Sequence, residues 1–356
     1  MNKGVSIQQI IEDEKFNNFK LIRLVAACMV IFYHACGFTN EKYDALSIIT
    51  DHATNFSYVG LSTFFFLSGL LVTQSLYYST SWKNFLWKRF LRIYPAAWLV
   101  ILSCMFILGP LVTSFPLNKY FTDPLFYNYA KGLSLIKIGY LLPGVFLNSP
   151  LNPSVNAPLW SINFELKLYL ALLVFYAFKF PFKKIILAAL IVVAVITDHF
   201  FYDATEAAVK TFSNDFVLYP YVDYAPYFLI GVLCFNFRNS IFSNFSIALL
   251  ALGLCCLSIK FDFFFIARLI VIPALVLYIS SLKPSLIKKI TPKPDLSYGL
   301  YVFAFPVQQL LSQTINSSAI YAWQMTLLCI LATLPLALFS WYMVEKKALS
   351  LKSIVK

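Results

Sequence analysis

The chain has 356 residues, of which 60% are hydrophobic and only 12% are charged, and its net charge is +12. A soluble domain of this length cannot cover so much apolar surface, so the composition predicts a protein whose solvent is the lipid bilayer. The same figures exclude coiled coils, collagen-like repeats and disordered chains. No polar stretch is long enough for an appended soluble domain, which leaves a polytopic membrane protein made of one domain.

Ten apolar stretches are long enough to cross about 30 Å of hydrocarbon, which predicts an all-α bundle of about ten spans. The segment 1–20 is polar and no A-x-A-like cleavage site follows the first span, so we expect a retained first helix. The predicted organisation is an N-terminal cytoplasmic segment 1–20, a membrane domain 21–346 and a short cytoplasmic tail 347–356. The predicted spans are 21–39, 57–77, 96–115, 155–178, 185–203, 222–237, 240–258, 263–282, 298–316 and 320–343.

The distribution of Lys and Arg predicts the orientation. With ten spans and a cytoplasmic N-terminus, 19 of the 28 basic residues fall in cytoplasmic segments and six fall in outer loops. Arg23, Lys167 and Arg268 lie inside spans. This bias places both termini in the cytoplasm. The positive charge is explained by anionic lipid at the cytoplasmic face, so it predicts no nucleic-acid partner.

Few residues are available for chemistry. The seven cysteines fall in or beside apolar spans without metal-ligand or redox spacing, so we interpret them as core-filling residues. The chain has three histidines, His34, His52 and His199, which is too few to favour a metal site. His52 and His199 fall near the outer surface on this topology, where solvated histidines are expected.

Arg23 and His34 form the most informative pair in the first predicted span. Eleven residues of helix advance about 16 Å and about three turns, so both side chains fall on nearly the same face. Charged or titratable groups inside a membrane are costly unless they face a polar cavity or a partner, which favours a functional role. The alternative is that Arg23 reaches a lipid headgroup and His34 caps the helix.

A basic segment, SWKNFLWKRFLRIYP, is predicted in the connection after the second span. It contains Lys88, and Arg89 and Arg92 lie three residues apart, so on a helical turn they face the same way. Arginine pairs bind phosphate with a bidentate geometry. The alternative is an ordinary positively charged cytoplasmic loop.

Two further segments combine small or polar residues with apolar surroundings. In FFFLSGLL, Ser68 and Gly69 allow close helix approach or let a thin ligand pass, and packing alone explains them equally well. In VNAPLWSINFELKLYL, Glu165 lies near the middle of the membrane with Ser161 and Tyr169 one turn away. This carboxylate is a functional hypothesis, with Arg23, Lys167 or His34 as its expected partner. A buried structural ion pair is the alternative.

Six motifs in this order resemble the acyltransferase 3 family of membrane acyltransferases, and the resemblance covers the chain past residue 17. Two positions depart from the family pattern: Ala304 stands where a histidine is often found, and Lys20 where an aspartate commonly precedes the arginine. Glu165 is the substitute partner that we expect for Arg23. The motifs are Arg23-x10-His34, FFFLSG at 64–69, KRFLRIYP at 88–95, LWSINFELKLY at 159–169, SYGLYVFAFP at 297–306 and FSWYMVEK at 339–346.

The resemblance implies transfer of an acetyl group from acetyl-CoA to a hydroxyl of a cell-envelope glycan at the bacterial plasma membrane. Lys88, Arg89 and Arg92 would bind the donor's phosphates, and its thin arm would pass Ser68 and Gly69. His34 would act as general base or carry the acyl group itself. Arg23 would orient the arm or stabilise negative charge, and Glu165 completes the expected catalytic set. A secondary transporter or flippase is the alternative, although the sequence shows no inverted repeat.

Overall fold

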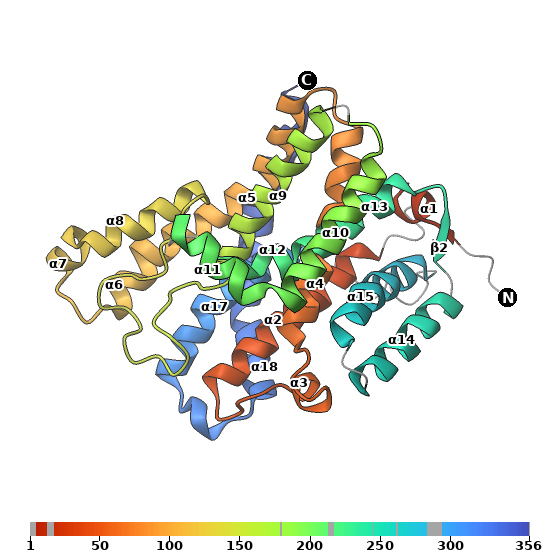
Figure 1. Ribbon diagram of the computed structural model, residues 1–356. Helices are drawn as coiled ribbons and strands as arrows, with labels where there is room; N and C mark the ends of the chain where they lie inside the picture. Colours follow the sequence, from red (N-terminus) through yellow and green to blue (C-terminus); the bar gives the residue numbers. More distant parts are fainter. Residues whose placement is uncertain are drawn as a thin grey trace.

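The computed structural model describes residues 5–12, 18–178, 180–212, 217–243, 245–260, 263–282 and 294–355. These residues are predominantly helical, which confirms the predicted all-α class, and Figure 1 shows their arrangement. In chain order the elements are β1 (Val5–Ser6), α1 (Ile7–Glu12), α2 (Phe19–Phe38), α3 (Ala45–Ile49), α4 (Phe56–Tyr77), α5 (Trp82–Ser103), η1 (Cys104–Leu108), α6 (Gly109–Val112), α7 (Leu117–Thr122), α8 (Pro124–Ala130), η2 (Lys131–Ser134), α9 (Leu159–Ala177), α10 (Lys183–Phe200), α11 (Tyr202–Phe212), α12 (Tyr219–Asp223), α13 (Ala225–Asn236), β2 (Ile241–Ser243), α14 (Phe245–Lys260), α15 (Phe264–Ser281), α17 (Ser297–Thr314), η3 (Ser317–Ala319), α18 (Ala322–Phe339), η4 (Ser340–Glu345), α19 (Lys346–Ser350) and η5 (Leu351–Ser353).

Within the described residues, six helices are long and apolar enough to cross a membrane. A seventh span results if α10 and α11, which are bent by 99° relative to each other, count as one. The chain is thus a multi-pass membrane protein. All ten predicted segments contain helix, but α13 and α14 have only 12 and 16 residues, respectively. The predicted number of ten spans therefore stays a prediction.

Helix α5 starts well before the predicted third span, 96–115. Its N-terminus is capped by Ser81, whose Oγ accepts a hydrogen bond from Asn84 N at 3.1 Å. The helix then runs without a break through η1 and α6 to Val112. The basic segment that we expected in a connection is therefore the first half of a long helix. Lys, Arg, Leu and Trp are all compatible with a helix, so the cap decides where it begins.

Helices α4 and α13 approach each other closely through two glycines. A Cβ atom on Gly69 would lie 2.0 Å from Phe228 O, and one on Gly231 would lie 2.3 Å from Phe66 O. Neither distance is possible for a real side chain, so this backbone contact requires glycine on both helices. The packing interpretation of Gly69 explains its position fully.

Helix α17 contains Pro306, which removes the backbone donor that would normally bond to Val302 O. Asn156, in the segment before α9, replaces that donor: its Nδ2 lies 2.9 Å from Val302 O. Two residues after Pro306, Gln308 Nε2 donates to Ile31 O of α2 at 2.8 Å. Around this proline, side-chain amides therefore hold α17 against α2 and the segment before α9.

The segments at the two ends of the described chain are packed on the bundle. Helix α1 buries Ile7 and Ile10 completely, and Val5 of β1 pairs with Ser243 of β2. At the other end, Trp87 Nε1 of α5 donates to Leu351 O at 2.9 Å, and Asn84 Nδ2 donates to the main-chain oxygen of Val355. The segment expected as a short tail is thus bonded to the start of α5.

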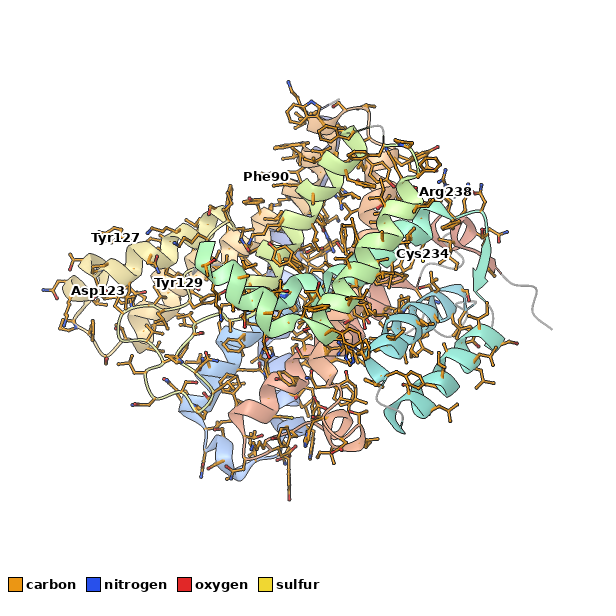
Figure 2. The ribbon with its side chains drawn as sticks, in the orientation of Figure 1. Phe90, Asp123, Tyr127, Tyr129, Cys234 and Arg238 are labelled. Carbon is orange, nitrogen blue, oxygen red and sulfur yellow. The ribbon has the colours of Figure 1, made fainter. Side chains whose placement is uncertain are left out.

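Helices α6, α7 and α8 extend sideways from the bundle, at the left of Figure 1. Tyr120 of α7 is fully buried and its Oη donates to Met105 O, 2.9 Å away, in the wider π-helical turn η1. On α8, Tyr127 is 58% exposed whereas Tyr129 is 1% exposed, so α8 has one buried face (Figure 2). This face fixes the extension to α5 and η1.

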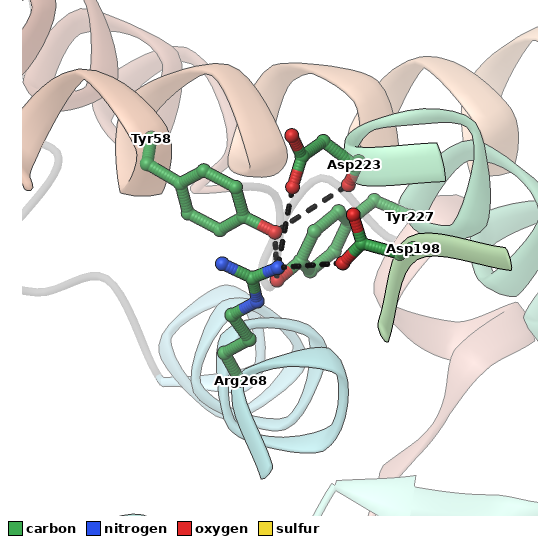
Figure 3. A network of polar contacts seen from close by, with 5 residues as sticks. All are labelled: Tyr58, Asp198, Asp223, Tyr227 and Arg268. Atoms are coloured by element: carbon green, nitrogen blue, oxygen red, sulfur yellow. Dashed lines mark hydrogen bonds and ion pairs between the residues drawn. The ribbon is translucent and has the colours of Figure 1, made fainter. Parts of the chain in front are cut away.

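The third basic residue predicted inside a span, Arg268, belongs to a separate buried network that joins five helices, α4, α10, α12, α13 and α15 (Figure 3). Its Nη2 lies 3.4 Å from Asp198 Oδ2 and 3.2 Å from Asp223 Oδ1. Its guanidinium also lies 4.4 Å from the centroid of the Tyr58 ring, and Tyr58 Oη contacts Tyr227 Oη at 3.4 Å. The charge of Arg268 is balanced within the fold, so this network is structural.

Candidate active site

Two adjoining cavities contain most of the predicted site residues. Arg23 of α2 and Arg89 and Arg92 of α5 line both, so the three arginines stand at their junction. We call the first the central cavity and the second the basic cavity. The central cavity is lined by Arg23, Leu61, Phe64, Phe65, Leu67, Ser68, Leu71, Val72, Arg89, Arg92, Ile93, Ser161, Ile162, Glu165, Tyr169, Ser297, Tyr298 and Tyr301. The basic cavity is lined by Lys20, Arg23, Leu71, Gln74, Ser75, Tyr78, Lys88, Arg89, Arg92, Asp295, Trp341, Leu349 and Lys352.

The basic cavity combines six cationic side chains with one carboxylate, Asp295, among its described lining residues. It encloses about 440 Å³, which is within the range of small-molecule sites. Trp341 and Tyr78 add aromatic surface, and Lys352 comes from the segment bonded to the start of α5. Such a cavity attracts anions, and its arginines suit phosphate groups in particular.

Lys88 and Arg89 make hydrogen bonds only to neutral groups in the part of the chain that the structure describes. Lys88 Nζ lies 3.2 Å from Ser79 Oγ, and Arg89 Nη2 lies 3.1 Å from Ser75 Oγ. Arg89 Nε is buried without a hydrogen-bond partner. Buried donors normally have partners, so these two cations retain capacity to bind an anion.

Arg92 and Arg23 instead share one carboxylate. Arg92 Nη2 lies 2.7 Å and Arg23 Nη2 lies 3.5 Å from Asp295 Oδ2, while Ser297 Oγ donates to Asp295 Oδ1 at 2.7 Å. Burial alone would raise the pKa of Asp295, but the two guanidinium groups outweigh it and hold this pKa well below its ordinary range. Asp295 is therefore ionised at neutral pH, and it is a partner for Arg23 that differs from the expected Glu165.

Glu165 of α9 accepts two hydrogen bonds on one oxygen. Ser68 Oγ of α4 and Tyr169 Oη each lie 2.5 Å from Glu165 Oε1. The expected partners Arg23, Lys167 and His34 form no hydrogen bond or ion pair with this carboxylate, and Lys167 is exposed elsewhere on α9. The geometry brings Glu165 and Ser68 together on the wall of the central cavity, which the sequence did not predict as a pair.

Tyr301 of α17 lines the central cavity. Its Oη lies 2.6 Å from Ser161 Oγ, and its ring meets that of Phe64 edge to face at 5.6 Å. One turn along α17, Phe305 makes the corresponding contact with the His34 ring at 5.1 Å. Aromatic side chains of α17 thus contact both the wall of the central cavity and His34.

His34 lines neither of the two cavities. Its Nδ1 lies 2.8 Å from Val30 O, a carbonyl that can only accept, so Nδ1 carries the proton. The second ring nitrogen, Nε2, then has a free lone pair. A neutral imidazole with this tautomer can act as a base or as a nucleophile.

The structure therefore unites Arg23, Ser68, Glu165, Arg89 and Arg92 around the central cavity and adds Lys88 in the basic cavity. It leaves His34 at the other end of α2 and places Gly69 against α13. Asp295 is the residue that sequence reasoning missed. In the sequence it stands out only by its place two residues before the SYGLYVFAFP motif, and nothing there links it to Arg23. Among the described residues no group of three or more His, Cys, Asp or Glu could hold a metal ion.

Comparisons with known proteins give the family of the chain. The family model of the acyltransferase 3 family, described as an acyltransferase domain, matches residues 16–343. The chain is 25% identical over 343 residues to a protein of Shigella phage Sf6 named O-acetyl transferase, covering 95% of this chain and 98% of that protein. It is 29% identical over 365 residues to nodulation protein 10 of Rhizobium leguminosarum bv. viciae, covering 95% and 94% of the two chains. No solved structure matches.

The family model covers nearly the whole membrane bundle, including every residue of the two cavities up to Trp341. This coverage decides between an enzyme and the transporter that the span pattern also allowed. The chain belongs to the acyltransferase 3 family and is a multi-pass membrane acyltransferase.

Proposed function

We propose that this protein transfers an acetyl group from cytoplasmic acetyl-CoA to a hydroxyl group of a cell-envelope polysaccharide or of its lipid-linked precursor. The observation that carries this proposal is the basic cavity, which adjoins the central cavity at Arg23, Arg89 and Arg92. The name of the Shigella phage relative, O-acetyl transferase, supports an acetyl group and an oxygen acceptor.

Acetyl-CoA fits the basic cavity by its charge. Its phosphates are the strongest anions on the molecule, and Lys88 and Arg89 bond to serine hydroxyls and form no ion pair among the described residues. Arginine grips a phosphate through two parallel hydrogen bonds, whereas lysine acts as a point charge. Lys20 and Lys352 line the same cavity and add to its positive field. The donor is a co-substrate, and the proposal involves no metal.

The thioester arm of the donor would extend from the basic cavity into the central cavity, which is more apolar. Ser68 and Glu165 stand on its wall, and Arg23 stands at its entrance. Arg23 would orient the thioester or stabilise the negative charge that develops on its carbonyl oxygen. Gly69 would contribute indirectly, because its contact with Phe228 holds the turn of α4 that carries Ser68.

At the acyl carbon, the transfer forms one bond and breaks one. The acceptor oxygen attacks the thioester carbonyl carbon, a C–O bond forms, and the C–S bond breaks to release CoA. His34 Nε2 would take the hydroxyl proton and return it to the leaving sulfur. In the alternative, Nε2 first accepts the acetyl group and then passes it to the acceptor. Both routes need the His34 tautomer that is protonated at Nδ1, which the hydrogen bond to Val30 O favours.

We further propose that the protein lies in the bacterial plasma membrane, with ten spans and both termini in the cytoplasm. The bias of 19 basic residues against six supports this orientation. It would place the basic cavity on the side where CoA exists, and the C-terminal end of α2 toward the envelope glycan. About 16 Å of helix separates Arg23 from His34, so the donor's arm would cross this part of the membrane.

The proposal is tested with membranes that contain the protein and acetyl-CoA labelled in its acetyl group. We expect label in extracted glycan, and glycan NMR of a deletion strain should lose one O-acetyl signal. Unlabelled glycan in the presence of folded protein would contradict the proposed donor or acceptor. Uptake or flipping of a glycan without covalent label would favour the transporter alternative.

A further inference from the structure

The cations of the basic cavity fall into two groups that differ in their partners. Arg23 and Arg92 pair with the Asp295 carboxylate, whereas Arg89 and Lys88 bond to serine hydroxyls. A carboxylate competes with a phosphate for a guanidinium, but a neutral hydroxyl does so only weakly. The two groups therefore cannot serve the donor in the same way.

Asp295 is itself fixed by its surroundings. It is 6% exposed, Ser297 Oγ donates to its Oδ1, and Arg92 Nη2 approaches its Oδ2 at 2.7 Å. Next to it, Tyr298 Oη donates to Ile93 O of α5 at 2.8 Å, which holds the start of α17 against α5. The carboxylate is thus a rigid anchor at the junction of the two cavities.

We propose that Asp295 is a positioning residue that orients Arg23 and Arg92 toward the passing acyl arm, and that Arg89 and Lys88 take the phosphates of the donor. This inference deepens the proposed function and rests on an acyl-CoA donor. It assigns Arg23 to the transfer step and Arg89 to donor affinity.

Substitution of Asp295 by Asn separates a positioning role from an electrostatic one. The Asp295→Asn change would remove a negative charge from a cavity for an anion, so CoA affinity should stay equal or increase. The freed arginines would lose their orientation, and kcat should fall by up to about 100-fold. Asp295→Glu keeps the charge and should retain more activity than Asp295→Asn. In contrast, Arg89→Ala should raise the Kd for CoA.

A second-site variant tests the geometry directly. Lys20 and Arg23 lie three residues apart on α2, so Lys20→Asp places a carboxylate one turn from Arg23. The double variant Lys20→Asp/Asp295→Asn should recover part of the kcat that Asp295→Asn loses. Asp223→Asn is the matched control, because it also removes a carboxylate from an arginine but lies in the Arg268 network of Figure 3. It should leave kcat and CoA affinity unchanged.

The experiment uses full-length protein in nanodiscs and reports kcat, the Kd for CoA, and the labelling rates of individual arginines by phenylglyoxal, resolved by mass spectrometry. In Asp295→Asn, Arg23 and Arg92 should react faster, and Arg89 should not. If the labelling rates of Arg23 and Arg92 stayed unchanged in Asp295→Asn, the inference would be overturned. A raised Kd for CoA with a normal kcat in this variant would also overturn it. Because labelling needs no donor, faster reaction of Arg23 and Arg92 in a protein that binds no CoA would refute the proposed function and leave the positioning role standing.

Discussion

Arg23 and His34 share helix α2 but not its surroundings: Arg23 lines both cavities, whereas the ring of His34 packs edge to face on Phe305 of α17. The two residues thus have different surroundings. The proposed reaction would need such a division, because its donor and acceptor would approach from opposite sides of the membrane.

Replacement of His34 by Ala should abolish transfer while the protein still folds. A general base contributes about 10²–10⁴-fold, and the labelled-acetyl assay should show at least that loss. His52→Asn is a suitable control, since His52 has a left-handed backbone (φ 65°) that Asn tolerates, and it should retain activity. Transfer close to wild type in the His34→Ala protein would refute the catalytic assignment.

Arg89→Ala should weaken CoA binding, and Arg89→Lys should restore it only in part because the bidentate fork is lost. Loss of a charge-assisted hydrogen bond is worth about 1.5–3 kcal/mol, so the Kd should rise by roughly 10- to 100-fold. Lys83→Ala, an exposed cation on the first turn of the same helix that lines neither cavity, should have no effect. If Arg89→Ala and Lys83→Ala raised the Kd equally, CoA affinity would depend on net charge and not on the position of Arg89.

Gly69→Ala tests whether this glycine serves packing. The new methyl would collide with Phe228 O, so α4 and α13 would have to separate, and the amount of folded protein should fall sharply. Gly253→Ala on α14 is the control, because nothing lies within 4 Å of its added Cβ. That variant should be neutral or up to about 1 kcal/mol more stable. Fluorescence-detected size exclusion with a heating series measures both. Normal folding of Gly69→Ala with loss of CoA binding would instead favour a role along the donor's path.

The Asp295 ion pairs should make stability depend on acid pH. Because the folded-state pKa of Asp295 is depressed, its contribution is present above the ordinary aspartate pKa of about 4 and is lost as pH falls toward the folded pKa. At neutral pH, Asp295→Asn should cost between roughly 1 kcal/mol, as for an exposed pair, and roughly 3–5 kcal/mol, as for a buried one. The difference in melting temperature between wild type and Asp295→Asn should shrink from pH 5 to pH 3. A constant difference would mean that the carboxylate charge is not what stabilises the fold.

Single cysteines in a cysteine-depleted protein test the proposed orientation. A membrane-impermeant thiol reagent applied to intact cells should label position 131 and not position 347. Lys131 follows α8 and Lys347 lies in α19, next to the basic cavity. Labelling at 347 would put the donor's phosphates on the side without CoA, and the proposed mechanism would have to be abandoned.

The sequence predicted the helical class, and it named several of the residues that line the two cavities, because both depend on local signals. Apolar length located ten segments that all contain helix, and spacing predicted that Arg89 and Arg92 face the same way on a helix, where both line the same cavities. Apolar length misplaced the start of α5, because apolar residues mark the part of a helix that lies in lipid and not the residue at which the helix begins. A side-chain cap on Ser81 sets that point.

The sequence could not predict the side-chain pairs between distant segments, for a different reason. The pairs Arg23–Asp295 and Ser68–Glu165 join segments far apart in the chain, and which carboxylate meets which partner depends on helix packing. Glu165 had been expected to hold Arg23, since both are rare charges inside spans. In the structure, Arg23 instead pairs with Asp295, which lies just before α17, and Glu165 accepts hydrogen bonds from two hydroxyl groups.

The bond between Asn84 and Val355 joins residues that are 271 positions apart. During synthesis α5 leaves the ribosome long before residues 341–355, so one wall of the basic cavity is completed only by the last part of the described chain to be made. A ribosome that stops early would release a membrane protein with most of its spans and an unfinished basic cavity, because Trp341, Leu349 and Lys352 line that cavity.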